Sequence, residues 1–180
     1  NKSGGAQAFL GNLVIGDNRN VGTPAAPQAT VTYGAGAANQ IPETNFHGTG
    51  LNTVTVNSNG KLDLTGAGTA GDAIGHLQMV TSNTVAAQVT TAASKLVLTG
   101  DINVATTNDS GYVSSAVTAV SRITGNLELG TLFSGAGGGF THNLAVSDTG
   151  VANIGADLII DGVISGSTGF SKTGGGTLML

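Results

Sequence analysis

The sequence contains no cysteine and no tryptophan, and only 9% of its residues are charged, against about a quarter in an ordinary soluble domain. The absence of cysteine excludes a disulfide framework and thiolate metal sites. Lysine and arginine total six and no two are adjacent, so the chain has no basic stripe to displace counterions from a nucleic acid. No apolar run approaches the roughly 18 residues of a membrane helix. We therefore expect neither a nucleic-acid partner nor membrane insertion by this segment.

The residues that are abundant suit short strands and tight turns. The hydrophobic fraction is 39%, carried by Val, Leu, Ile and Ala, and there are 30 glycines. Branched aliphatic residues and threonine fit a pleated surface, whereas glycine and asparagine fit turns. The composition therefore predicts an all-β protein.

Apolar and polar residues alternate in short runs bounded by Gly, Asn, Asp or Ser, which is the pattern of half-buried strands. These runs are 51–56, 61–65, 95–99, 101–104, 125–129, 143–147 and 157–160. Two stretches rich in Ala, Val and Thr, 85–91 and 114–120, show no helical stripe and are also predicted to be strands. Residues 22–50 are predicted to form one longer loop excursion, because proline and an Ala-rich stretch interrupt the pattern there.

Strands this short must bury one face in a sandwich, a barrel or a solenoid. Aromatic residues, at 4%, are too few for a broad sandwich core, whereas aliphatic residues fill a narrow solenoid. We predict one β-solenoid unit over residues 1–180, with rungs of about 20 residues and therefore about 8–9 rungs. The residues predicted to face its interior are Leu13, Ile15, Val54, Val56, Leu62, Leu64, Leu96, Leu98, Ile102, Val104, Leu127, Leu129, Leu144, Val146, Leu158, Ile160, Val163, Leu178 and Leu180.

The closing stretch, residues 158–180, resembles the autotransporter-associated β-strand repeat of bacterial surface proteins. Residues 11–17, 39–64 and 123–129 are similar to earlier strands of such units, in the same order. The resemblance implies a right-handed parallel β-helix displayed outside the cell, on the surface of a Gram-negative-type bacterium, and it implies no activity. The positions that match the closing motif are Val163, Ile164, Ser165, Gly166, Gly169, Lys172, Gly174, Gly176, Thr177, Leu178 and Leu180, with Phe170 where leucine is commoner.

Neither end of the chain shows the polar or irregular cap that closes natural solenoids. Open solenoid ends present unpaired backbone groups that invite pairing. We therefore expect a non-catalytic structural protein that stacks head-to-tail, as a homo-oligomer, into a surface filament or tandem fibre. The residues expected at the contacting ends are Phe9, Leu10, Leu13, Ile15, Thr177, Leu178, Met179 and Leu180.

Two glycine patterns suggest ligands but lack their usual context. Residues 66–71 fit G-x-G-x-x-G, yet no helical stripe follows to hold a pyrophosphate, so a turn is favoured over a dinucleotide site. Gly71–Asp72 and Gly100–Asp101 are single Gly-Asp pairs without the register of calcium-binding repeats, so isolated turn aspartates are favoured. No cofactor is expected, and calcium binding in turns is left open.

Other chemistry has few candidates. His47, His76 and His142 lie far apart and are interpreted as solvent-facing or turn histidines, because zinc needs three or four converging ligands. One alternative function is an adhesin or carbohydrate-binding passenger that uses its turns and residues 22–50 to contact a glycan or other cell-surface ligand. Another is a β-helical polysaccharide lyase or glycosidase, which needs facing carboxylates. The acids that could share a face for that chemistry are Asp63, Asp101, Glu128 and Asp161.

Overall fold

The computed structural model describes residues 7–19, 27–44, 50–106, 118–131, 141–149 and 155–180. These residues form strands and turns, and no helix among them is long and apolar enough to cross a membrane. The prediction of an all-β protein is confirmed. The strands are β1 (Leu13–Ile15), β2 (Ala29–Thr32), β3 (Thr53–Val56), β4 (Gly60–Asp63), β5 (Asp72–Ile74), β6 (His76–Thr81), β7 (Gln88–Leu98), β8 (Ile102–Thr106), β9 (Ser121–Leu129), β10 (Thr141–Val146), β11 (Leu158–Asp161), β12 (Ile164–Gly166), β13 (Gly169–Thr173) and β14 (Leu178–Met179).

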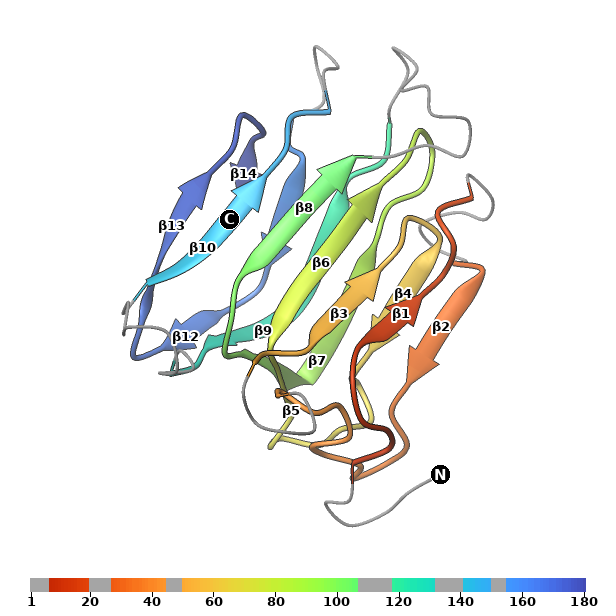
Figure 1. Ribbon diagram of the computed structural model, residues 1–180, viewed down its shortest axis with the longest axis vertical. Helices are drawn as coiled ribbons and strands as arrows, with labels where there is room; N and C mark the ends of the chain where they lie inside the picture. The colour runs from red at the N-terminus through yellow and green to blue at the C-terminus, as the bar shows by residue number, and fades with distance from the viewer. Residues whose placement is uncertain (1–6, 20–26, 45–49, 107–117, 132–140, 150–154) are drawn as a thin grey trace.

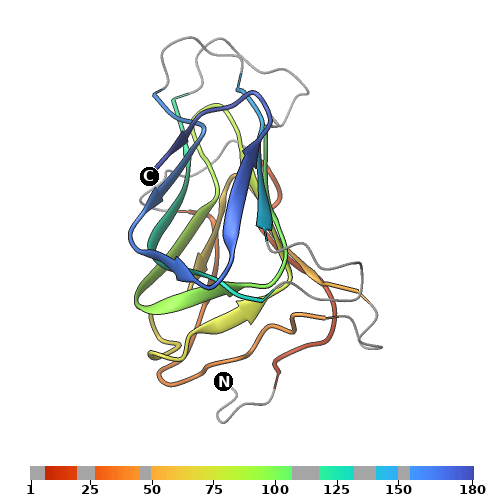
Figure 2. The same ribbon diagram turned by 90° about the vertical axis from the view of Figure 1, so that its left-hand side faces the viewer.

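The strands build two sheets, and every strand pairing within them is parallel. Sheet I has six strands in the order β1-β3-β6-β8-β10-β13. Sheet II has eight strands: β14-β11-β9-β7-β4-β2, with β5 paired to β7 and β12 paired to β9. Along the chain, strands pass back and forth between the two sheets, with two consecutive strands in sheet II at β4–β5 and at β11–β12. Neighbouring strands in each sheet therefore come from segments far apart in sequence. Figures 1 and 2 show the sheets on opposite sides of the interior.

The two longest strands of sheet II, β7 and β9, bend in the middle. Their first halves pair with β4 and β11, and their second halves pair with β5 and β12. At the bend, Ala92 has φ 49° and Gly125 has φ 102°, and the register shifts. A Cβ on Gly125 would lie 2.8 Å from the backbone nitrogen of Ala92, so only glycine fits this corner. Sheet II is thereby folded into two panels.

One continuous aliphatic core fills the space between the sheets. Paired strands align their inward residues in rows, because side chains alternate faces with a period of two. Residues Val31, Leu62, Val89, Ile123 and Ile160 form one such row across sheet II. The inward predictions confirmed as fully buried are Ile15, Val54, Val56, Leu62, Leu64, Leu96, Leu98, Ile102, Val104, Leu127, Leu129, Leu144, Val146, Leu158 and Ile160. Leu13 and Leu178 are partly buried against the same core.

Two inward predictions are wrong. Val163 is 62% exposed, because the chain bends at Gly162 and the inward position falls on the next residue, Ile164, which pairs with buried Leu127. Leu180 is 70% exposed, because it follows the edge strand β14 and no described strand covers it.

The spacing between paired strands is less regular than the predicted repeat of about 20 residues. Paired positions on neighbouring strands are 20 residues apart at Leu158 and Leu178, but 42 apart at Ile102 and Leu144. Long connections between some strands therefore use much of the chain, and sheet I contains six strands where 8–9 rungs of about 20 residues were expected.

Loop and strand boundaries differ from expectation in three places. The predicted excursion 22–50 contains β2, which pairs with β4 in sheet II, so that interpretation is wrong for Ala29–Thr32. Of 85–91, only 88–91 belong to a strand, β7. Of 114–120, residues 118–120 are not in a strand, and 114–117 lie outside the described residues.

Candidate functional site

The predicted contact residues lie at the two ends of the sheets. Strands β1 and β2 lie at one end, and β13 and β14 at the other, and each has one strand neighbour among the described residues. Phe9, Leu10, Leu13 and Ile15 belong to the first end, and residues 177–180 belong to the second. Each end therefore combines an unpaired strand edge with the last residues of the core rows.

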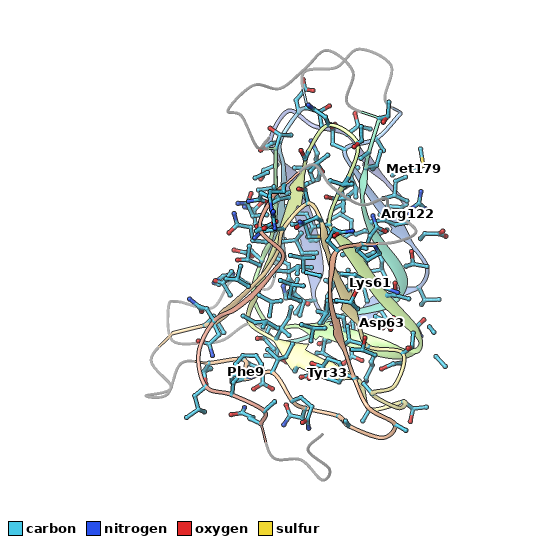
Figure 3. The ribbon with its side chains drawn as sticks, turned by 90° about the vertical axis from the view of Figure 1, so that its right-hand side faces the viewer. Phe9, Tyr33, Lys61, Asp63, Arg122 and Met179 are labelled. Atoms are coloured by element: carbon cyan, nitrogen blue, oxygen red, sulfur yellow. The ribbon has the colours of Figure 1, made fainter. Side chains whose placement is uncertain are left out.

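The end formed by β1 and β2 contains a cavity of about 190 Å³. Phe9 and Tyr33 both lie at this end of the molecule (Figure 3). Phe9 packs against the core, and the nitrogen of Ala8 donates to the Gln40 carbonyl at 2.8 Å, so this end is partly covered and not fully open as expected. The residues that line the cavity are Ala8, Phe9, Val31, Thr32, Tyr33, Gly34, Ala37, Gln40 and Ile41.

The opposite end is partly apolar and carries one ammonium group. Met179 is 46% exposed, and the nitrogen of Thr177 donates to Asp157 Oδ2 at 2.7 Å. Lys172 pairs with buried Leu144, so it stands in an inward row, yet it is exposed. Its Nζ donates to the Gly174 carbonyl at 2.6 Å. The ammonium therefore turns back to its own strand end instead of pointing across the core.

A buried pair close to the β1–β2 end was missed by the sequence analysis. Asp72 is 1% exposed, and its Oδ2 accepts hydrogen bonds from the Tyr33 hydroxyl and from the nitrogens of Gln40 and Ile41 at 2.7 and 3.1 Å. Burial raises the pKa of Asp72, and burial together with the nearby Asp72 charge raises the pKa of Tyr33. Asp72 begins β5, so its interpretation as a turn aspartate is wrong. Its hydrogen bonds join the segment after β2 to strand β5.

Two of the three histidines lie in the described part of the chain. His47 lies outside the described residues. His142 is fully buried, with Nδ1 2.5 Å from the Gly100 carbonyl and Nε2 2.9 Å from the Gly130 carbonyl, so its interpretation as a solvent-facing or turn histidine is wrong. His76 lies on the outer face of sheet I. The described residues contain no cluster of three or more metal-ligating side chains.

The candidate carboxylates for glycoside chemistry are separated. Asp63 and Asp161 stand in one outer row, but three strand spacings apart, or about 14 Å, beyond the about 6.5–9.5 Å of catalytic pairs. Each has a cation: Lys61 Nζ is 2.8 Å from Asp63, and Arg122 is 3.4 Å from Asp161. Of these side chains, Lys61, Asp63 and Arg122 are labelled in Figure 3, on the side of the molecule formed by sheet II.

The two remaining acids lie elsewhere. Glu128 binds Lys95 at 2.6 Å on the second half of β9, and Asp101 precedes β8 in sheet I. The four acids therefore do not form the facing pair that a polysaccharide enzyme needs.

The G-x-G-x-x-G stretch forms turns between β4 and β5, with no helix after it. A Cβ on Gly66 would lie 3.0 Å from the Gly34 carbonyl oxygen and closer still to the Tyr33 carbonyl. Glycine at this position thus lets the turn lie against the backbone of Tyr33 and Gly34, as the turn interpretation predicts.

A polar hollow of about 330 Å³ lies on the outer face of sheet I, which faces the viewer in Figure 1. Among its residues, only Asp101 and His76 had been considered from the sequence as candidates for chemistry. The other residues occupy the polar, outward positions of alternating strands, which the sequence does show. Which of these positions lie side by side can be known only from the register of the strands. Its lining residues are Thr53, His76, Leu77, Gln78, Asp101, Ile102, Asn103, Asn143 and Ala145.

Comparison of the chain with family models, curated proteins and solved structures found no match. The resemblance of residues 158–180 to the autotransporter-associated repeat therefore stays a prediction from the motif.

Proposed function

We propose that this chain is a non-catalytic structural segment, a right-handed parallel β-helix that stacks head-to-tail into an extracellular fibre. The observation that carries the proposal is the parallel register, which continues each core row to an unpaired edge at both ends. The chain passes repeatedly from one sheet to the other and back, as it would in a coil of stacked rungs. Display on the surface of a Gram-negative-type cell rests on the motif in residues 158–180.

The core rows define how a second copy would dock. Leu178 pairs with Leu158, and Met179 pairs with Ile159. If the register continues by one residue, Leu180 extends the row that runs through Ile160. The same row ends at Val31 of β2 at the other end. If β14 of one copy adds to β2 of the next, Leu180 reaches Val31 and covers the cavity beside Tyr33. Exposed aliphatic surface is then removed from water at both ends, which favours association by about 25 cal/mol per Å².

Lys172 limits the strength of this contact. It stands in the row that starts at Leu13 and includes Leu144. On stacking, its methylene stem would be buried while the ammonium stays at the strand end with the Gly174 carbonyl, as long basic side chains do at apolar surfaces. A charge in an inward row is also a known device against uncontrolled edge pairing. We therefore expect concentration-dependent, reversible stacking.

Electron microscopy and sedimentation velocity of the purified chain test this proposal. Rods that lengthen with protein concentration are expected. Leu180→Asp should shorten or abolish the rods, whereas Val163→Asp, a similarly exposed position on a side panel, should leave them unchanged. Lys172→Leu should lengthen them. Separate particles at every concentration, or rods indifferent to Leu180→Asp, would refute head-to-tail docking.

A further inference from the structure

We propose that the polar hollow on the outer face of sheet I is a binding site for a neutral oligosaccharide. This site lies on the side of the stack, away from the two ends, so the proposal does not depend on head-to-tail assembly.

The hollow is rich in unused hydrogen-bonding groups. The side-chain amides of Gln78 and Asn103 have no partner among the described residues, and Asn103 is exposed. Asp101 uses Oδ1 to accept from the Asn143 nitrogen at 2.8 Å, which leaves Oδ2 for a ligand. His76 accepts the Asp101 nitrogen at Nδ1, 3.0 Å away, which leaves Nε2 for a ligand. Donors and acceptors therefore face solvent together.

The charge of the hollow selects among ligand classes. Its lining contains one carboxylate, Asp101, and one imidazole, His76, and neither lysine nor arginine. A phosphate, sulfate or uronate would find no cation there. Leu77 and Ile102 are buried on the core side, so their apolar side chains are not offered to a ligand either. Neutral hydroxyl groups, which both donate and accept, satisfy amides and a carboxylate best.

The arrangement of the polar groups favours an extended ligand. Thr53 pairs with His76, and Gln78 pairs with Asn103, on strands spaced about 4.8 Å apart. The same outer rows continue to Asn143 and Ala145. A chain of sugar residues laid across β3, β6, β8 and β10 would meet a new set of partners at each strand. An oligosaccharide therefore gains contacts that a monosaccharide cannot.

A polypeptide ligand is disfavoured by the same topology. Peptides that join sheets do so at an exposed edge, through main-chain hydrogen bonds. The strands β3, β6, β8 and β10 each lie between two neighbours within sheet I, so their backbone groups are already engaged. What remains for recognition is side chains alone.

The site is also held in place before a ligand arrives. The nitrogen of Asp101 is bound to His76, the nitrogen of Asn143 is bound to Asp101, and Thr173 Oγ1 donates to Asn143 Oδ1 at 2.7 Å. These bonds link β6, then the residue that precedes β8, then β10 and then β13, which are neighbours in sheet I. A rigid set of partners reduces the ordering cost of binding.

Isothermal titration calorimetry of the whole chain tests the assignment. The probes are neutral hexasaccharides of glucose, mannose and N-acetylglucosamine, with hexagalacturonate as the anionic comparison. At least one neutral probe should bind, and more tightly than hexagalacturonate. The double variant Gln78→Ala with Asn103→Ala removes only outward side chains, and it should weaken binding by about tenfold or more.

The matched control is Thr90→Ala with Thr124→Ala, two paired outer positions on sheet II, which should bind as the unchanged chain does. Failure of all three neutral probes to bind, a preference for hexagalacturonate, or equal binding by the amide double variant would overturn the assignment. Loss of rods with retained binding would refute stacking alone, and loss of binding with retained rods would refute this site alone.

Discussion

The middle of the stack and its two ends use the same aliphatic residues with different results. Leu62, in a strand with a neighbour on each side, is fully buried, whereas Leu180, on the extension of the same row, is 70% exposed. The side chains are chemically identical, and both follow the period-two pattern. The difference is that Leu62 has a paired strand on each side, whereas Leu180 follows the edge strand β14 and has no paired position. In this architecture burial is a property of neighbouring levels as much as of sequence.

The largest expected effect contrasts a middle row with an end. Leu127→Asp should lower the free energy of unfolding by about 4 kcal/mol or more, because it buries a charge without a partner. Leu180→Asp, measured where the chain is monomeric, should change it by only about 0.5 kcal/mol or less. Urea denaturation followed by circular dichroism checks both values. Equal losses would show that the end is not open.

The second contrast concerns corners. Gly125→Ala should cost about 1–3 kcal/mol, because its φ of 102° is strained for any residue with a Cβ and the Cβ would meet the backbone at Ala92. Gly169→Ala, in β13 at the end of sheet I, adds a Cβ that meets nothing within 4 Å and should be nearly neutral. Thermal unfolding of the two variants gives the comparison. A neutral Gly125→Ala would argue against the bend in β9.

The third contrast is between two aspartates near the β1–β2 end. Burial raises the pKa of Asp72 above its ordinary 3.8, so as pH rises from 3.8 through the higher folded-state pKa, this group reduces stability. Hydrogen bonds from Asn59 and, to a smaller extent, from Arg19 lower the pKa of Asp17. Asp17 therefore stabilises the fold above pH 3.8, and this stabilisation is lost as the pH falls through the lowered pKa.

Unfolding free energies measured across the acid range check these signs. Asp72→Asn should remove the loss of stability on raising pH, and Asp17→Asn should remove the loss on lowering it. Tyr33→Phe should cost about 2 kcal/mol near neutral pH, because the Asp72 carboxylate loses a hydrogen bond. A stability curve unchanged by Asp72→Asn would contradict the raised pKa.

The smallest expected effect is at the surface of the middle levels. Lys95 and Glu128 form a half-exposed pair at 2.6 Å between β7 and β9. A double-mutant cycle with alanine should give a coupling of about 0.2–1 kcal/mol that diminishes in high salt. A much larger coupling that salt does not reduce would contradict the partial exposure of the two side chains.

The sequence predicted much of the core and little of the surface sites. Alternation placed Leu96, Leu98 and Ile102 inside correctly, because a strand with one buried face needs apolar residues at every second position. It failed at Val163, where a bend restarts the alternation. The Tyr33–Asp72 pair could not be predicted, since its two members are 39 residues apart and meet only through stacking.

The same reason separates what the sequence alone determined from what the tertiary structure decided. Composition and period-two alternation determined an all-β chain with an aliphatic interior, because those features depend on local geometry and solvation. The tertiary structure decided which levels are neighbours. Spacings between paired positions range from 20 to 42 residues, so the sequence has no fixed repeat from which the register could be predicted. Register in turn decides which polar residues share the hollow on sheet I, which aspartate is buried and which leucine is left exposed.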